Sequence, residues 1–124
     1  MNATVDKQEQ YAVLTLNEPK LSSLLSPAMK SELVVLNNEG IKNIILDLSS
    51  VNFIDSSGLS AILVGNRMCK NAGGSFILTG LGDNVIKLLK ISQLDNILNI
   101  FPTKTEAIDF VLMEEVERDI SDDE

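Results

Sequence analysis

The run IKNIILDL, Ile41 to Leu48, constrains the fold of this chain more than any other stretch. Ile44 to Leu46 and, past Asp47, Leu48 are apolar, so a strand here would bury side chains on both of its faces. Strands of this kind occur in parallel sheets that helices cover on each side. We therefore expect an α/β domain in which this strand lies inside the sheet.

The rest of the chain alternates between strand and helix patterns. β-prone runs indicate strands at 11–16, 75–80 and 96–101, and a weaker strand before residue 10 that forms a hairpin with the first. Helical spacing of apolar residues predicts four helices, which begin near residues 26, 56, 83 and 103. With 124 residues, 44% of them hydrophobic, the chain suffices for one core. The expected fold is a single α/β domain with a mostly parallel sheet of four to five strands and about four helices.

Cap residues mark three of these helix starts. Ser26, followed by Pro27, and Asp83 would each accept a hydrogen bond from a free backbone N–H of the first turn. Thr103 and Glu106 have the spacing of a capping box. In the helix that begins near residue 56, small residues on one side predict a close approach to a neighbouring helix: Gly58, Ala61 and Gly65.

The segment NFIDSSGL, Asn52 to Leu59, joins a strand pattern to a helix pattern. Functional groups gather at such junctions in α/β sheets, because backbone N–H groups and the helix dipole point outward there. Asp55 and Ser56 fall at the cap and the first turn. One interpretation is therefore that one of them caps the helix and has no other role.

Catalytic interpretations of this segment have little support. The chain contains no histidine, so a serine nucleophile or the single Cys69 would lack the usual base. Asp55 as the phospho-acceptor of a receiver-like domain would need further acids to hold Mg²⁺, and only Glu18 lies near the required strand end. The glycines of 80–83 lack the rest of a phosphate-binding loop. We expect no enzyme, no catalytic residue, no metal site and no cofactor.

The block LDLSSVNFIDSSGLSAIL resembles the central signature of the STAS domain, as found in bacterial anti-sigma factor antagonists (anti-anti-sigma factors). In that family the motif D-S-[ST]-G-[LI] follows the third strand and opens the second helix, and the resemblance covers residues 1–113. It implies a regulatory binding module whose motif serine is phosphorylated, which is Ser56 here, with Ser57 as the runner-up. The partner-binding residues it implies are the motif and one residue of the loop before the first helix: Asp55, Ser56, Ser57, Gly58, Leu59 and Ser22.

The resemblance also implies partners. The unphosphorylated form is expected to bind a kinase-like anti-sigma factor, an ATP-dependent serine kinase, and so to release a sigma factor; phosphorylation reverses this, and a serine phosphatase restores binding. Ser22 stands where relatives commonly carry the acid of G-x-[LI]-D, so this loop departs from the family pattern. The alternative is a STAS regulatory subunit or scaffold of a transporter or larger signalling assembly. We expect no direct contact with nucleic acid or membrane, and a cytoplasmic monomer or weak dimer.

The net charge of −8 is concentrated at the C-terminal end. The last eleven residues, 114–124, carry seven acids and one arginine, which leaves eleven acids and nine bases in the first 113. Such a tail is typically the solvated end of a helix that runs into disorder, and less often a docking segment for a basic partner. Only Val116 and Ile120 are expected to anchor the segment after Met113.

Overall fold

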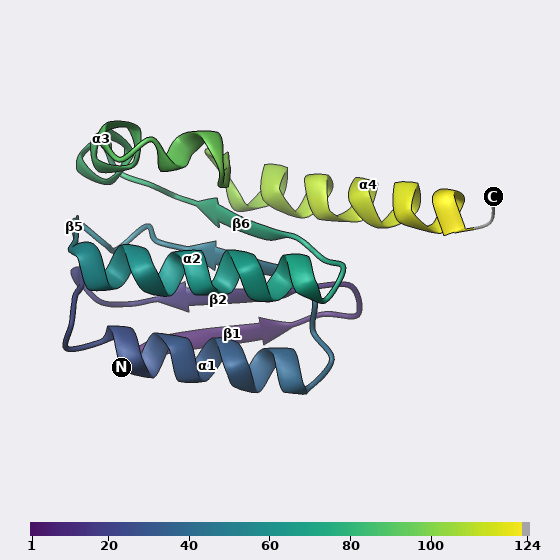
Figure 1. Cartoon of the computed structure of the whole chain (residues 1–124), viewed down its shortest axis with the longest axis horizontal. Helices are drawn as coiled ribbons and strands as arrows, with labels where there is room; N and C mark the ends of the chain where they lie inside the picture. The colour runs from purple at the N-terminus through teal and green to yellow at the C-terminus, as the bar shows by residue number, and fades with distance from the viewer. Residues whose placement is uncertain (123–124) are drawn as a thin grey trace.

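The computed structural model describes the backbone of residues 1–122 and the side chains of residues 1–120. Strands and helices alternate along it (Figure 1). The strands are β1 (Ala3–Lys7), β2 (Ala12–Leu16), β3 (Lys20–Leu21), β4 (Ile44–Asp47), β5 (Phe53–Ile54), β6 (Phe76–Thr79) and β7 (Asn99–Phe101). The helices are α1 (Ser26–Asn38), α2 (Ser56–Asn71), α3 (Asp83–Ile91), a short 3-10 turn at Leu94–Asn96, and α4 (Lys104–Asp122).

A five-stranded sheet in the order β1-β2-β4-β6-β7 forms the centre of the molecule. β1 and β2 pair antiparallel as the expected hairpin, and the other three pairings are parallel. The predicted α/β fold with a mostly parallel sheet is therefore confirmed, and the sheet is mixed because of its N-terminal hairpin. The last strand is shorter than predicted, because the 3-10 turn at Leu94–Asn96 and the turn and bend residues after it occupy the positions before Asn99.

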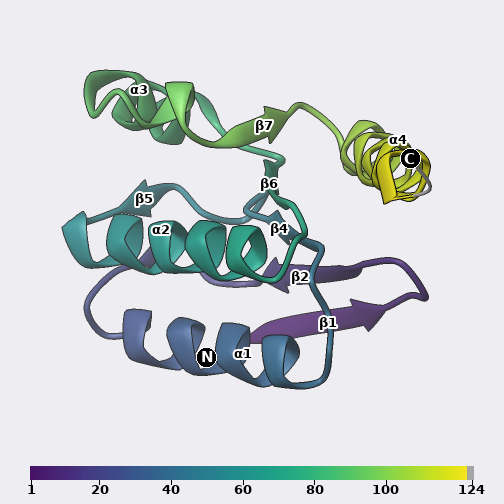
Figure 2. The ribbon, with the colours of Figure 1, turned by 45° about the vertical axis from the view of Figure 1, so that its right-hand side comes forward.

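Helices cover both faces of this sheet, as the apolar run in β4 predicted. Ile44 and Leu46 point into the larger core, where they meet side chains of α1, α2 and α3. Ile45 points the other way and lies in register between Val13 and Ile77, in the smaller core that α4 closes. Figure 2 shows α1 and α2 on one side of the strands and α4 on the other.

The small residues of α2 let this helix pack closely, as expected. Gly58, Ala61 and Gly65 are all buried. A methyl group on Gly65 would come within 2.7 Å of the Phe76 ring and 3.2 Å of the Leu33 side chain, both tighter than ordinary van der Waals contact. Glycine at this position therefore sets the spacing between α2, the sheet and α1.

A second, two-stranded sheet was not predicted from the sequence. β3 and β5 pair parallel, with Lys20 opposite Phe53 and Leu21 opposite Ile54. Two residues are too few to show the alternation that identifies a strand. The pairing nevertheless fixes the loop before α1 against the start of α2.

Two of the three expected caps are wrong. Ser26 is the first residue of α1, and its hydroxyl donates to the Ser22 carbonyl oxygen at 2.8 Å instead of capping the helix. Gly82 is the N-cap of α3, and Asp83 makes no cap bond. Thr103 forms one half of its capping box, since its hydroxyl oxygen accepts from the Glu106 N–H at 3.2 Å.

The anchors expected for the end of α4 are also wrong. Val116 and Ile120 are 58% and 57% exposed, whereas Glu115 is only 8% exposed. Polar contacts of Glu115 and Arg118 hold this part of α4 to the sheet instead. Residues 123 and 124 of the predicted acidic tail lie outside the described residues.

Candidate functional site

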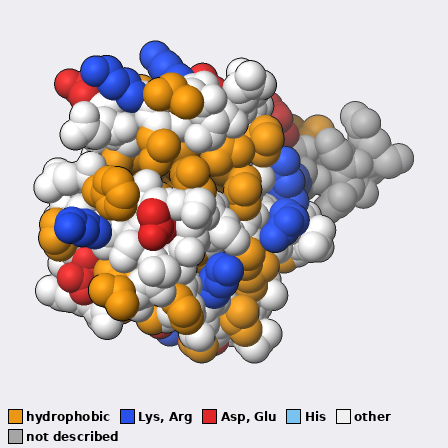
Figure 3. Space-filling view, turned by 60° about the vertical axis from the view of Figure 1, so that its left-hand side comes forward, with side chains coloured by type: hydrophobic (Ala, Val, Ile, Leu, Met, Phe, Trp, Pro, Cys, Tyr) orange, Lys and Arg blue, Asp and Glu red, His pale blue; other side chains and the backbone are white. Residues whose placement is uncertain are grey.

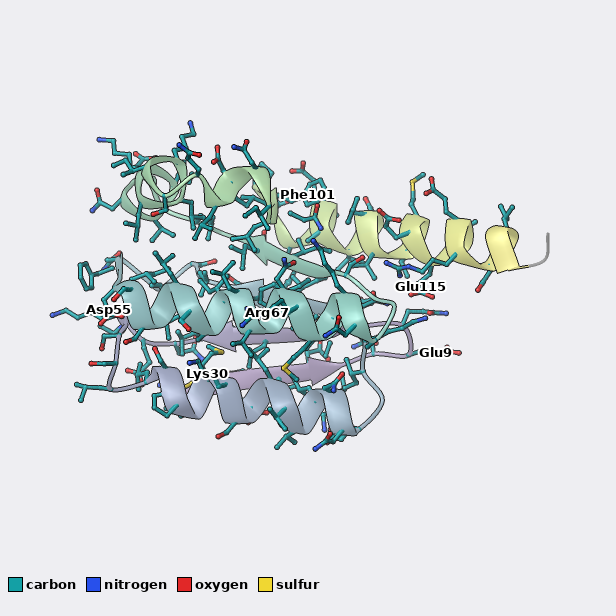
Figure 4. All side chains as sticks on the ribbon, viewed as in Figure 1. Glu9, Lys30, Asp55, Arg67, Phe101 and Glu115 are labelled. Carbon is teal, nitrogen blue, oxygen red and sulfur yellow. The ribbon has the colours of Figure 1, made fainter. Side chains whose placement is uncertain are left out.

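The site predicted from the sequence lies where β5 hands over to α2. Asp55 is the N-cap of α2, and its Oδ1 accepts a hydrogen bond from the Gly58 N–H at 2.9 Å. Its Oδ2 accepts from the Ser23 N–H at 3.1 Å. One carboxylate therefore caps the helix and holds the loop before α1 in place. Figure 4 shows Asp55 at the beginning of α2.

Ser56 is the first residue of α2, and its side chain is exposed. No hydrogen bond of its hydroxyl is found among the residues that the structure describes. Of the two cap candidates, Asp55 fills the role. The cap interpretation thus accounts for Asp55 and leaves Ser56 without a structural function.

Ser57 faces a different environment from its neighbour. It is partly buried and lines a cavity of about 310 Å³ between the starts of α1 and α2. The other lining residues are mostly polar: Ser23, Ser26, Pro27, Lys30 and Ser60. An enzyme that must reach a serine hydroxyl from solvent would find Ser56 more accessible than Ser57.

Gly58 is buried because the loop before α1 crosses it closely. A methyl group here would collide with the Leu21 carbonyl oxygen and lie 2.7 Å from the Ile54 side chain. Ser22 shapes the same loop, since its carbonyl oxygen accepts from the N–H groups of Leu25 and Ser26. The loop containing Ser22 and the DSSG motif therefore form one continuous surface.

The motif continues into the core at Leu59. Its side chain is partly buried and packs against the larger hydrophobic core. The six residues expected to bind a partner thus lie together at the start of α2, although Gly58 and Leu59 contribute mainly packing.

An apolar groove of about 320 Å³ lies beside this surface, and sequence reasoning missed it. It runs between β5 and α3 and is lined by Asn52, Phe53, Ile54, Asn84, Val85, Lys87, Leu88 and Ile91. Phe53 is 53% exposed and Ile91 80% exposed. Figure 3, which views the molecule from the end at which α2 begins, shows apolar side chains gathered on this face. The only signal in the sequence was Ile91, an apolar residue outside the Val85, Leu89 face of α3.

The polar groups at this site are the Asp55 carboxylate and the hydroxyls of Ser56 and Ser57. Among the described residues, no three His, Cys, Asp or Glu side chains lie close enough together to hold a metal ion. The Cys69 thiol is buried, and desolvation raises its pKa to about 12, so it stays protonated and unreactive. No side chain that the structure describes hydrogen-bonds the Ser56 hydroxyl, and this hydroxyl is exposed to solvent.

Comparison with known proteins agrees with this geometry. A family model described as the STAS domain matches residues 2–107. This chain belongs to the STAS domain family. The signature that suggested the family in the sequence is the segment that forms β5, the Asp55 cap and the start of α2.

STAS proteins of the anti-sigma factor antagonist group are similar to this chain. The anti-sigma-B factor antagonist of Bacillus subtilis is 30% identical over 101 residues, which are 81% of this chain and 92% of that protein. A Thermotoga neapolitana relative is 36% identical over 74 residues, and the chain spans just under two thirds of that relative, 66%. The Bacillus cell fate determinant SpoIIAA, solved in its phosphorylated form, has the same fold, with a TM-score of 0.69, 22% identity, and coverage of 89% of this chain and 99% of that one.

No described helix of this STAS protein is long and apolar enough to cross a membrane.

Proposed function

We propose that this STAS protein is an anti-sigma factor antagonist that is switched by phosphorylation of Ser56. The observation that carries the proposal is that Asp55 and Ser56, although adjacent, have different structural roles. Asp55 caps α2, while Ser56 is exposed and takes no part in the cap. A group added to Ser56 therefore changes the surface and leaves the fold intact. The similarity to the Bacillus subtilis antagonist supports the regulatory, non-enzymatic role.

The charge of a phosphate suits this role. It adds about −1.5 to −2 charges at neutral pH. At the start of α2 the helix dipole favours an anion by about 0.3–1 kcal/mol, and the adjacent Asp55 carboxylate opposes it by a similar amount at a solvated surface. The module should be about equally stable in both forms.

A bound partner would respond much more strongly. Closing a protein surface over a dianion beside a carboxylate costs several kcal/mol unless a cation meets it. A loss of about 3 kcal/mol lowers affinity more than a hundredfold. The unphosphorylated form therefore binds a kinase-like anti-sigma factor and frees a sigma factor, the kinase uses ATP to phosphorylate Ser56 and end the interaction, and a serine phosphatase reverses this.

The neighbouring groove supplies affinity that does not depend on the switch. Phe53 and Ile91 present apolar surface in the groove between β5 and α3, which an apolar side chain of the partner can cover. In the loop before α1, Ser22 offers no carboxylate, so the partner needs no cation opposite this position. Contact there depends on the backbone shape that Ser22 and Asp55 stabilise.

Paired substitutions at Ser56 test the switch. Because Asp55 is the cap, Ser56→Ala should cost less than about 0.5 kcal/mol of stability and bind the partner as the wild type does. Ser56→Asp should fold equally well but bind at least tenfold more weakly, because it places a second carboxylate beside Asp55. Ser31→Asp, an exposed position on α1, is the matched control for added charge.

Recovery from native cells supplies the partner, and mass spectrometry maps the modification. We expect a kinase-like protein and a single phosphate on Ser56. Titration of the recovered partner with each variant, and circular dichroism of each fold, completes the test. Equal affinity of the alanine and aspartate variants, or phosphate on Ser57 only, would refute the assignment. Recovery of a membrane transporter in place of the kinase would favour a STAS transporter subunit.

A further inference from the structure

The outward side of α4 carries a row of apolar side chains with no covering element. Leu112, Met113, Val116 and Ile120 are 40%, 65%, 58% and 57% exposed. Val116 lies four residues after Leu112 and three after Met113, and Ile120 lies four residues after Val116, so the four form one stripe along the helix. We call these four residues the α4 stripe. A single exposed apolar residue is ordinary, but four in a row on one helix face are typical of a contact surface.

Buried polar contacts fix the helix so that this stripe points outward. Glu115, on the buried side of α4, accepts a hydrogen bond from the Asn43 side-chain amide at 2.8 Å. Arg118 donates to Glu115 at 2.7 Å and to the Ser75 hydroxyl oxygen at 2.7 Å. Rotating α4 to bury Val116 would break these contacts and leave the Glu115 carboxylate either exposed or buried without a hydrogen-bond partner. The exposure of the α4 stripe is therefore a fixed property of the fold.

The charges around the α4 stripe have one sign. From Thr105 to Ile120 the helix contains six acids and one base, Arg118, and that base pairs with Glu115. By helical spacing, Asp119 flanks the α4 stripe on one edge and Glu117 on the other, and Asp109 lies in line with the stripe one turn before Leu112 and Met113. All three of these acids are exposed. The surface is thus an apolar row between two acidic edges.

The acidic edges and the apolar row together determine which kind of partner can bind to α4. A second copy of α4 laid on the first would place acidic edges against acidic edges, and an anionic membrane surface would be repelled in the same way. A helix with an apolar face and basic edges would cover the apolar row and neutralise both edges at once. We propose that the α4 stripe and its acidic edges form a docking surface for a basic amphipathic helix of a partner protein.

This surface is separate from the phosphorylation site. Asp55 and Glu115 lie toward opposite ends of the molecule, and α4 covers the other face of the sheet from α2 (Figures 2 and 4). A partner on α4 would leave Ser56 free. The protein can therefore hold two partners together, and the inference does not depend on the proposed switch.

Peptide binding tests the chemistry of the surface directly. The probe is a fluorescent 14-residue amphipathic peptide of leucine and lysine, and a leucine and glutamate peptide of the same pattern is the reference. Fluorescence anisotropy with the full chain should show binding of the lysine peptide only, weakened by salt. Val116→Ser with Ile120→Ser, and separately Glu117→Lys with Asp119→Lys, should each weaken binding at least tenfold.

A matched pair of exposed apolar residues on α1 is the control. Val34 and Val35 are 44% and 49% exposed, so Val34→Ser with Val35→Ser removes similar surface elsewhere and should change affinity less than twofold. Circular dichroism confirms that each variant is folded. The proposal would be overturned if the α1 control lost as much affinity as the α4 variants, or if the two peptides bound equally well. A dimer in sedimentation that the Val116 and Ile120 substitutions dissociate would also overturn it.

Crosslinking identifies the natural occupant. A photoreactive amino acid at position 116 of the full chain, irradiated in the native cells, should attach to a segment that mass spectrometry identifies as amphipathic and net positive. Attachment to another copy of this chain, to lipid or to an acidic segment, or no attachment at all, would refute the assignment of a basic helix.

Discussion

Asn43 joins more parts of the fold than any residue singled out in the sequence. It is fully buried, and its amide donates to the Gln10 carbonyl oxygen at 2.9 Å and to Glu115 at 2.8 Å. Its side-chain oxygen accepts from the Ser75 N–H at 2.8 Å. The β1–β2 turn, β4, β6 and α4 therefore meet at one side chain. We predict that Asn43→Ala destabilises the protein severely.

The magnitude follows from the groups left behind. The substitution strands the Ser75 N–H, which is buried, and removes a hydrogen bond from the nearly buried Glu115 carboxylate. Each unsatisfied buried group costs about 1–3 kcal/mol, with charged groups at the upper end, so we expect a loss of about 3–5 kcal/mol. Domains of this size are stable by about 5–15 kcal/mol. The melting temperature should fall by roughly 10–20 °C.

Urea unfolding followed by circular dichroism measures this loss. Asn38→Ala, at the exposed end of α1, is the matched control and should change stability by less than about 0.5 kcal/mol. If Asn43→Ala costs less than about 1 kcal/mol, the amide does not organise this junction, and the account of α4 anchoring fails with it.

Three further predictions concern other parts of the molecule. Gly58→Ala should lower the free energy of unfolding, measured in urea, by at least about 2 kcal/mol and weaken partner binding, because the added methyl group displaces the loop before α1. Gly82→Ala is the control and should be tolerated, because its methyl group would point into open space. Burial alone raises the pKa of Glu115, but the Asn43 hydrogen bond and the charges of Lys42 and Arg118 lower it overall. The contribution of Glu115 to the free energy of unfolding is therefore full above about pH 4.5 and is lost as the pH falls further. In the Glu115→Gln variant, the free energy of unfolding should depend less on pH in this acidic range. Cys69 should resist a thiol reagent at pH 8 until urea unfolds the protein.

Much of the fold could be predicted because its signals are local. The apolar run of β4, the hairpin before it and the apolar periodicity of the helices each lie within a few residues of sequence. The helix caps failed because cap choice depends on how the chain enters the helix. Gly82 and Leu25 take the cap positions of α3 and α1, and the serine and aspartate beside them follow as first helical residues.

The candidate site was only partly visible in the sequence. The DSSG motif marked the junction, but two equivalent cap candidates could not be separated until the Asp55 bonds to Gly58 and Ser23 were known. The groove at Phe53 and Ile91, and the Asn43 junction with Glu115, arise between elements far apart in the chain. Their members look ordinary one at a time, so spacing alone could not group them.

The placement of α4 has a consequence for synthesis. Val13, Ile45 and Ile77 lie on the sheet face that α4 closes, and all three precede α4 in the chain. At about 5–20 residues per second, the 19 residues of α4 take on the order of a second or more to be translated. During that time the apolar face of these strands has no helix to cover it. A stalled ribosome would hold the nascent chain with this apolar face exposed, and chaperones and proteases could then bind it before α4 covers it.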